Sequence, residues 1–144
     1  MNIDTALSYD DVLLVPQYSD ILSRREVSLG CDLGANLKFE LPIISSPMDT
    51  ITEAAMANCL QSLGGLGVVH RYNSIEEQVG IMQQITHQTK AAAIGISGDY
   101  LDRAAALIES GATILCLDVA HGHHLMMCEA LFKLKTLYDD RIHL

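Results

Sequence analysis

The sequence has no tryptophan and few other aromatic residues, with two Phe and five Tyr among 144 residues. Almost half of the residues are nonetheless hydrophobic, and most of these are Ala, Ile, Leu, Val and Met. This composition is sufficient for a packed core and excludes a chain that is disordered throughout. Small and aliphatic side chains of this kind favour packed helices and buried parallel strands.

Basic residues are also scarce, because nine Lys and Arg stand against 18 Asp and Glu and give a net charge of −9. The only basic pair is Arg24–Arg25, so no basic stripe can neutralise the phosphates of a nucleic acid. No apolar run reaches the ~18 residues that span a bilayer, and the first residues show no secretory signal. We therefore expect neither a nucleic-acid nor a membrane partner, and a cytoplasmic location.

The four cysteines are widely spaced and lie mostly in apolar runs, at Cys31, Cys59, Cys116 and Cys128. Their spacing matches neither a disulfide framework nor a zinc ribbon. We expect them to be reduced and buried. None stands beside a candidate base, so the sequence shows no activated nucleophile.

An irregular segment over residues 1–40 precedes four short β-prone runs that alternate with amphipathic segments over residues 41–144. The predicted strands are 41–45, 66–70, 91–96 and 113–118, and 141–144 resembles the opening of a fifth. Strands that are separated by single helices predict a parallel sheet with right-handed crossovers. The fold class is therefore α/β, with about four βα units.

The predicted helices carry recognisable start and stop signals. Thr50 with Glu53 and Ser74 with Glu77 match capping boxes, and Asp99 is a candidate cap for the third helix. Gly64–Gly65 and Gly111 predict the ends of the first and third helices. The predicted apolar stripes are Met56, Cys59, Leu60 and Leu63; Ile75, Val79, Met82 and Ile85; Leu101, Ala104, Ala105 and Ile108; and Met127, Leu131, Leu134 and Tyr138.

Functional residues of parallel sheets gather where the strands end and the βα loops begin. The four loops predicted at that edge are 45–50, 70–73, 96–98 and 118–124, and all are polar or contain glycine. A carboxylate such as Asp118 can accept hydrogen bonds from sugar hydroxyls, or it can cap the following helix. His121 and His123 could bind a metal with Asp118 or form a solvated turn. A metal site needs three or four converging ligands and the sequence fixes no others, so we expect none.

Four motifs together resemble the IMP dehydrogenase and GMP reductase family. They are Ser8–Pro16, Ser45–Glu53, Gly64–His70 and Leu117–His123, and the resemblance, to the family's N-terminal half, covers nearly the whole chain. It implies the N-terminal half of a (β/α)8 TIM barrel that binds a purine nucleotide, GMP or IMP, and a nicotinamide cofactor, NADP or NAD. It also implies a nucleophilic cysteine and a monovalent-cation site on loops after Leu144, so this chain alone is expected to be inactive.

The resemblance also implies roles for residues of the four loops. Ser46 and Met48 would line the nucleotide site. Asp118 would hold the nicotinamide ribose of the cofactor. The other residues expected beside the cofactor are Ala120, His121, Gly122, His70 and Arg71.

Residues 78–90 join the second helix directly to the third strand, without the regulatory CBS domains that most IMP dehydrogenases insert there. This join and the segments 23–27 and 116–119 resemble GMP reductase, whereas 45–53 and 64–67 resemble IMP dehydrogenase. We predict NADPH-dependent reductive deamination of GMP to IMP, with NAD-dependent oxidation of IMP to XMP as the alternative.

Two further hypotheses belong to other classes of protein. A half-barrel with open edges could be a non-enzymatic module that pairs with a second copy, as a homo-oligomer, or with a complementing C-terminal half. The third hypothesis is a metal-dependent hydrolase that uses His121 and His123.

Overall fold

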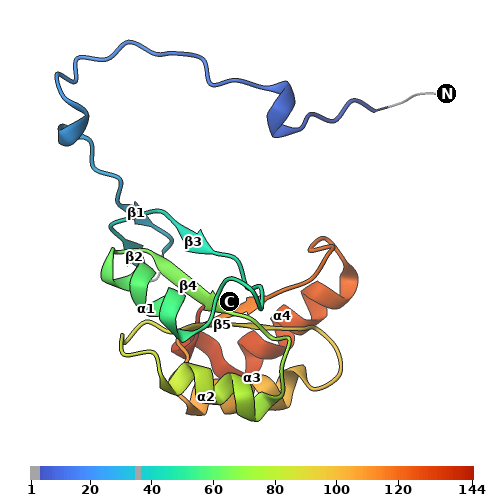
Figure 1. The fold of residues 1–144 in the computed structure, drawn as a ribbon. Helices are drawn as coiled ribbons and strands as arrows, with labels where there is room; N and C mark the ends of the chain where they lie inside the picture. The colour runs from blue at the N-terminus through green and yellow to red at the C-terminus, as the bar shows by residue number, and fades with distance from the viewer. Residues whose placement is uncertain (1–3, 35–36) are drawn as a thin grey trace.

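The computed structural model describes residues 4–34 and 37–144 and contains a parallel sheet with the order β3-β4-β5-β6 (Figure 1). Each strand is followed by one helix, so the predicted four βα units are confirmed, and the arrangement is that of half a (β/α)8 barrel. The strands are β3 (Ile44–Ser45), β4 (Leu66–Val69), β5 (Ala91–Ile94) and β6 (Ile114–Leu117). The helices are α1 (Ala54–Ser62), α2 (Ile75–Gln83), α3 (Tyr100–Glu109) and α4 (Leu125–Tyr138).

The N-terminal segment lies apart from this body. Figure 1 shows residues 4–30 as a long arm, which is extended except for the single turns η1 (Tyr9–Asp11) and η2 (Arg24–Glu26). A small antiparallel hairpin of β1 (Cys31–Asp32) and β2 (Lys38–Phe39) then leads into the sheet. The motif 8–16 is therefore an exposed arm and not a strand.

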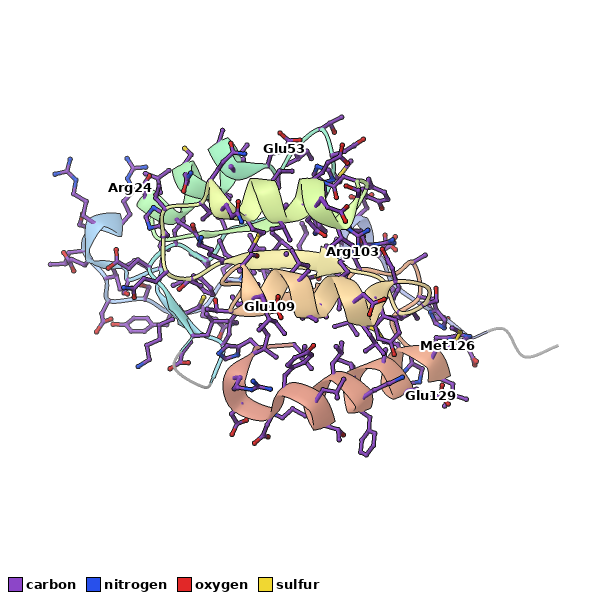
Figure 2. All side chains as sticks on the ribbon, turned by 90° about the horizontal axis from the view of Figure 1, so that it is seen from below. Arg24, Glu53, Arg103, Glu109, Met126 and Glu129 are labelled. Carbon is purple, nitrogen blue, oxygen red and sulfur yellow. The ribbon has the colours of Figure 1, made fainter. Side chains whose placement is uncertain are left out.

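The two faces of the sheet enter two different hydrophobic cores, because successive side chains of a strand point to opposite faces. The helices cover one face, where Val69, Ala92, Ile94 and Leu115 pack with buried side chains of α2, α3 and α4. On the other face, Val68, Ala91, Ala93 and Ile114 pack with Phe39 of the hairpin. Figure 2 shows the helices side by side over the strands.

Helix α1 packs on the sheet through small residues, and the predicted stripe of larger ones is wrong. Met56, Cys59 and Leu63 are exposed, whereas Ala54 and Ala57 are buried. A Cβ placed on Gly67 of β4 would lie 2.5 Å from the Cα of Ala57. The backbones of α1 and β4 are thus close enough that only small side chains fit between them.

The start of α1 also differs from the prediction. The helix begins at Ala54 with Glu53 as its N-cap residue, so Thr50 does not cap it. Thr50 lies instead in a turn, where the carbonyl of Met48 accepts hydrogen bonds from the amides of Ile51 and Thr52. This turn occupies the position that a capping box would need.

The other helix signals are largely confirmed. Ser74 and Glu77 form a complete capping box at α2. Gly64 and Gly111 adopt φ values of +83° and +97° at the ends of α1 and α3, where glycine is favoured. Asp99 precedes α3 but makes no capping hydrogen bond with its side chain. The expected stripes of α2 and α4 face the core, with Met82, Ile85 and Leu134 buried.

The predicted fifth strand is present only as a single bridge. The amide of His143 donates to the carbonyl of Thr113 at 3.0 Å, and the amide of Leu115 donates to the carbonyl of His143 at 2.8 Å. Arg141 belongs to the short turn η3 (Asp139–Arg141). Among the residues that the structure describes, no helix is both long and apolar enough to cross a bilayer.

Candidate functional site

The structure brings together two of the predicted cofactor residues at the carboxyl ends of the strands. Arg71 follows β4 and Asp118 follows β6. The Nε of Arg71 donates to Oδ2 of Asp118 at 3.2 Å, and Nη2 donates to the Asp118 backbone carbonyl at 3.1 Å. Both side chains are roughly one third exposed, at 32% and 28%. A partly exposed carboxylate and a guanidinium therefore share this edge of the sheet.

Arg71 reaches Asp118 by crossing the end of the intervening strand. A Cβ on Gly95, which follows β5, would lie 3.7 Å from Nη1 of Arg71. The guanidinium carbon is also 5.3 Å from the ring centre of Tyr72, within the range of a cation–π contact. The end of β5 thus leaves room for the guanidinium, which lies between a carboxylate and an aromatic ring.

Cys116 lies on β6 two residues before Asp118. Burial raises the pKa of its thiol, and the negative charge of Asp118 raises this pKa further. A raised pKa keeps the thiol protonated, and only the thiolate is a strong nucleophile. The chemistry of Cys116 therefore differs from that of an activated cysteine.

All four cysteines are free, as predicted, but Cys59 and Cys128 are exposed and so the prediction that they are buried is wrong. We expect iodoacetamide at mildly alkaline pH to alkylate these two at least about tenfold faster than Cys116, because burial and a raised pKa both slow the reaction. Peptide mass spectrometry over time measures the three rates. Alkylation of Cys116 first would contradict this description of the site.

His70 does not join the Arg71–Asp118 pair, although the sequence places it beside Arg71. It is 3% exposed, and its Nδ1 accepts a hydrogen bond from the amide of Tyr72 at 3.2 Å. The ring proton is thus on Nε2, which faces Oε1 of Glu53 at 3.5 Å. The buried ring of His70 therefore holds the loop after β4 through its hydrogen bond with the amide of Tyr72.

A hollow of about 540 Å³ beside His70 opens between the loop that precedes α1 and the helix α2. Its lining includes the carboxylates of Asp49, Glu53 and Glu77. Three acidic side chains disfavour the phosphate groups of a nucleotide. A second hollow, of about 500 Å³, lies at the amino ends of the strands, away from the Arg71–Asp118 pair.

The predicted substrate residues Ser46 and Met48 lie exposed in the loop between β3 and α1. The loop is anchored by Thr52, whose fully buried hydroxyl lies 2.8 Å from Oγ of Ser45 and 2.6 Å from the Ser46 carbonyl. The amide of His70 also donates to the carbonyl of Thr52, which ties this loop to the next one. Sequence reasoning missed Thr52, because it assigned only Thr50 and Glu53 of this segment to a capping box.

The remaining predicted cofactor residues, Ala120, His121 and Gly122, are exposed in the loop after β6. His124 ends this loop by capping α4, since its Nδ1 accepts from the amide of Met126 at 3.2 Å. Within residues 4–34 and 37–144, no group of three His, Cys, Asp or Glu side chains is arranged to hold a metal ion.

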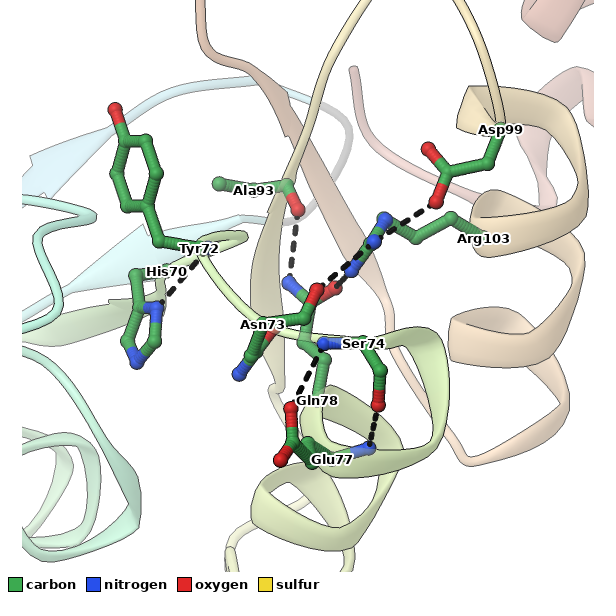
Figure 3. A network of polar contacts seen from close by, with 9 residues as sticks. All are labelled: His70, Tyr72, Asn73, Ser74, Glu77, Gln78, Ala93, Asp99 and Arg103. Atoms are coloured by element: carbon green, nitrogen blue, oxygen red, sulfur yellow. Dashed lines mark hydrogen bonds and ion pairs between the residues drawn. The ribbon is translucent and has the colours of Figure 1, made fainter.

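Sequence reasoning also missed a buried polar network behind the loop that follows β4. Gln78 is fully buried on α2, and Arg103 of α3 is 7% exposed. Figure 2 shows Arg103 between these two helices, and Figure 3 shows its contacts with Gln78, Asn73 and Asp99. A buried polar side chain inside an amphipathic pattern gives no sequence signal beyond a break in the stripe.

Comparison with known proteins identifies relatives of this chain. Residues 6–144 match the model of the IMP dehydrogenase / GMP reductase domain. The inosine-5'-monophosphate dehydrogenase of Cryptosporidium parvum is 32% identical over an alignment covering 94% of this chain and 44% of the relative. The enzyme of the same name from Nitrosopumilus maritimus is 45% identical over 69% of this chain and 20% of the relative.

The corresponding protein of Bacillus subtilis is 50% identical over half of this chain and 14% of its own length. The chain therefore spans less than half the length of these curated relatives. The matched domain includes both loops that carry Arg71 and Asp118. The chain belongs to the IMP dehydrogenase / GMP reductase family.

Proposed function

We propose that this chain supplies the nucleotide- and cofactor-binding half of an oxidoreductase that transfers hydride from IMP to NAD. The observation that carries the proposal is the partly exposed Asp118 carboxylate at the carboxyl edge of the sheet, held by Arg71. The relatives quoted above, which are named IMP dehydrogenases, support this choice of substrate. NAD is the cofactor that such a reaction requires.

The residues at this edge fit a nicotinamide dinucleotide. Arg71 contacts one carboxylate oxygen of Asp118, and a carboxylate has enough lone pairs to accept further bonds from the two ribose hydroxyls. The guanidinium is a donor for the pyrophosphate, and the 60% exposed ring of Tyr72 offers an apolar face. When bound, the cofactor supplies the hydride acceptor. Asp118 orients its ribose, and Arg71 balances charge.

The purine nucleotide belongs beside Ser46 and Met48 in this proposal. The Ser46 hydroxyl can donate to a nucleotide oxygen, and the 47% exposed Met48 side chain can contact the purine face. The buried Thr52 hydroxyl holds the loop in place, so the two residues are presented without large motion.

The family resemblance implies a nucleophilic cysteine, and none of the four cysteines of this chain is a clear candidate for it. The pKa of the Cys116 thiol is raised, and Cys59 and Cys128 are exposed on the helices α1 and α4. Cys31 is in the hairpin at the amino ends of the strands. Because the family resemblance implies it, we propose that the nucleophile lies on a loop after Leu144.

The test uses the 144-residue chain with IMP and NAD⁺. Titration calorimetry is expected to show binding of both ligands, whereas absorbance of NADH is expected to show no turnover. Measurable turnover would contradict our assignment of the nucleophile to a later segment. Absence of binding for either ligand would contradict the proposed function.

GMP reduction with NADPH is the second candidate. It is favoured by residues 23–27 and 116–119, and by the direct join over 78–90. The same titration with GMP and NADPH separates the candidates, because a reductase should bind this pair more tightly than IMP and NAD⁺. Tighter binding of IMP and NAD⁺ would exclude the reductase assignment.

We also propose that the half-barrel associates, either with a second copy or with a complementing C-terminal half. Edge strands present unpaired backbone groups, and β6 pairs outward only with His143 among the described residues. Light scattering is expected to show a mass above 15.7 kDa that rises with concentration. A monomer at all concentrations would exclude the second copy as the partner.

A further inference from the structure

The pairing between β4 and β5 ends at the point where Arg71 leaves the sheet. Val69 is the register partner of Ala92, so a longer parallel ladder would next join the Arg71 amide to the Ala93 carbonyl. The side-chain amide of Gln78 occupies that carbonyl instead, with Nε2 donating at 2.9 Å. A side chain of α2 thus replaces a backbone partner, and the chain after β4 is free to turn toward β6.

Arg103 connects the side chain of Gln78 to the loop after β4. Its Nη1 donates to Oε1 of Gln78 at 2.8 Å, and its Nη2 donates to the Asn73 carbonyl at 3.0 Å and to Oδ2 of Asp99 at 2.8 Å. A buried guanidinium is stable only when its donors are satisfied. Arg103 therefore fixes the backbone of Asn73 relative to α2 and α3 (Figure 3).

The loop after β4 is now held on both sides of Arg71. Before it, the buried ring of His70 accepts a hydrogen bond from the amide of Tyr72. After it, Asn73 is held by Arg103, and Ser74 and Glu77 form the capping box of α2. Arg71, which lies between these held residues, reaches the end of β6 and contacts Asp118.

We propose that Gln78 and Arg103 are positioning residues that set the reach of Arg71 to Asp118. They touch no ligand and act through the loop backbone. The value of this reach for cofactor binding rests on the proposed function, but the positioning itself is a property of the folded chain and can be measured without a ligand.

The direct readout is the Nε–H proton of Arg71, which donates to Asp118. In a ¹⁵N-labelled chain, Arg71→Lys identifies this signal by its loss. A proton in a hydrogen bond to a carboxylate exchanges slowly with water, because the bond must open before the proton can exchange. In Gln78→Met, which keeps the shape but removes both hydrogen bonds, we expect exchange to accelerate at least about tenfold.

The matched control is Asn58→Ala. The Asn58 amide also ties two elements together, because it donates to the Gln84 carbonyl and accepts from the amide of Thr86. These two contacts lie at the C-terminal end of α2, which is the end opposite the loop after β4. Their loss should lower the melting temperature without changing the exchange of the Arg71 proton.

Arg103→Lys keeps the test decisive if Gln78→Met does not fold. Lysine retains the charge and the contact with Asp99, but a single ammonium cannot reproduce the fork that joins Gln78 to the Asn73 carbonyl. Faster exchange in this variant supports the proposal. A lower melting temperature with unchanged exchange in the folded variants would overturn it, because the network would then serve stability alone.

Ligand binding forms the second arm. Gln78→Met is expected to weaken NAD⁺ binding about tenfold and to leave IMP binding unchanged, since IMP is assigned to the loop after β3. If the unmodified chain binds no NAD⁺, the proposed function fails and the exchange measurement still decides the positioning. Equal NAD⁺ affinity in Gln78→Met and the unmodified chain would overturn the inferred link to cofactor binding.

Discussion

Replacing Gly67 with alanine is expected to lower the free energy of unfolding by about 3 kcal/mol. The added methyl group would lie 2.5 Å from the Cα and 2.8 Å from the Cβ of Ala57. The Cα atom belongs to the backbone of α1 and cannot rotate away, so the helix must shift off β4. Urea unfolding, followed by circular dichroism, measures the change as a lower midpoint with an unchanged slope.

Gly80→Ala is the matched control. Gly80 lies in α2, and a Cβ at this position meets nothing within 4 Å. Alanine is a better helix former than glycine by about 1 kcal/mol, so this variant should be as stable as the parent or more stable. If Gly67→Ala were no less stable than Gly80→Ala, the close packing of α1 on β4 would be refuted.

Asp118→Ala is expected to weaken NAD⁺ binding about 100-fold, as measured by titration calorimetry. The carboxylate is proposed to accept the ribose hydroxyls, and a hydrogen bond to a charged group contributes about 1.5–3 kcal/mol. The substitution also removes the partner of Arg71. Because the pair is roughly one third exposed, this loss should cost less than about 1 kcal/mol of stability.

Two comparisons separate ligand contact from a general change of charge. Asp118→Asn keeps the shape but removes the charge, so its affinity should fall between those of the parent and Asp118→Ala. Asp102→Asn makes the same change at an exposed position of α3 and should leave NAD⁺ binding unchanged. Equal losses in Asp118→Asn and Asp102→Asn would point to overall charge and contradict a ribose contact.

The sequence was sufficient to predict the alternation of strands and helices, the parallel sheet and which loops share an edge. Parallel strands with single helices between them place all their carboxyl ends together, so the neighbourhood of Arg71 and Asp118 follows from the element order. Their direct ion pair does not follow. It depends on the end of β4 turning toward β6, which a side chain of α2 determines.

Other errors have equally local causes. The stripe predicted for α1 consists of its larger apolar residues. The helix instead packs on the sheet through the face that meets Gly67, where no side chain keeps the two backbones apart. Thr52 was given no role, because only Thr50 and Glu53 were assigned to a capping box, but its hydroxyl is buried in the turn after β3. Gln78 and Arg103 are polar, and only the three-dimensional structure shows that they satisfy each other inside the protein.

The most direct test of the account is a titration of the ¹⁵N-labelled chain with NAD⁺, followed by the shifts of its backbone amide signals. We predict that the shifts concentrate in residues 70–73, 95–98 and 118–122, at the carboxyl ends of β4, β5 and β6. Shifts that concentrate instead around Lys38, Gln61 and His87, in the hollow at the amino ends of the strands, would contradict it.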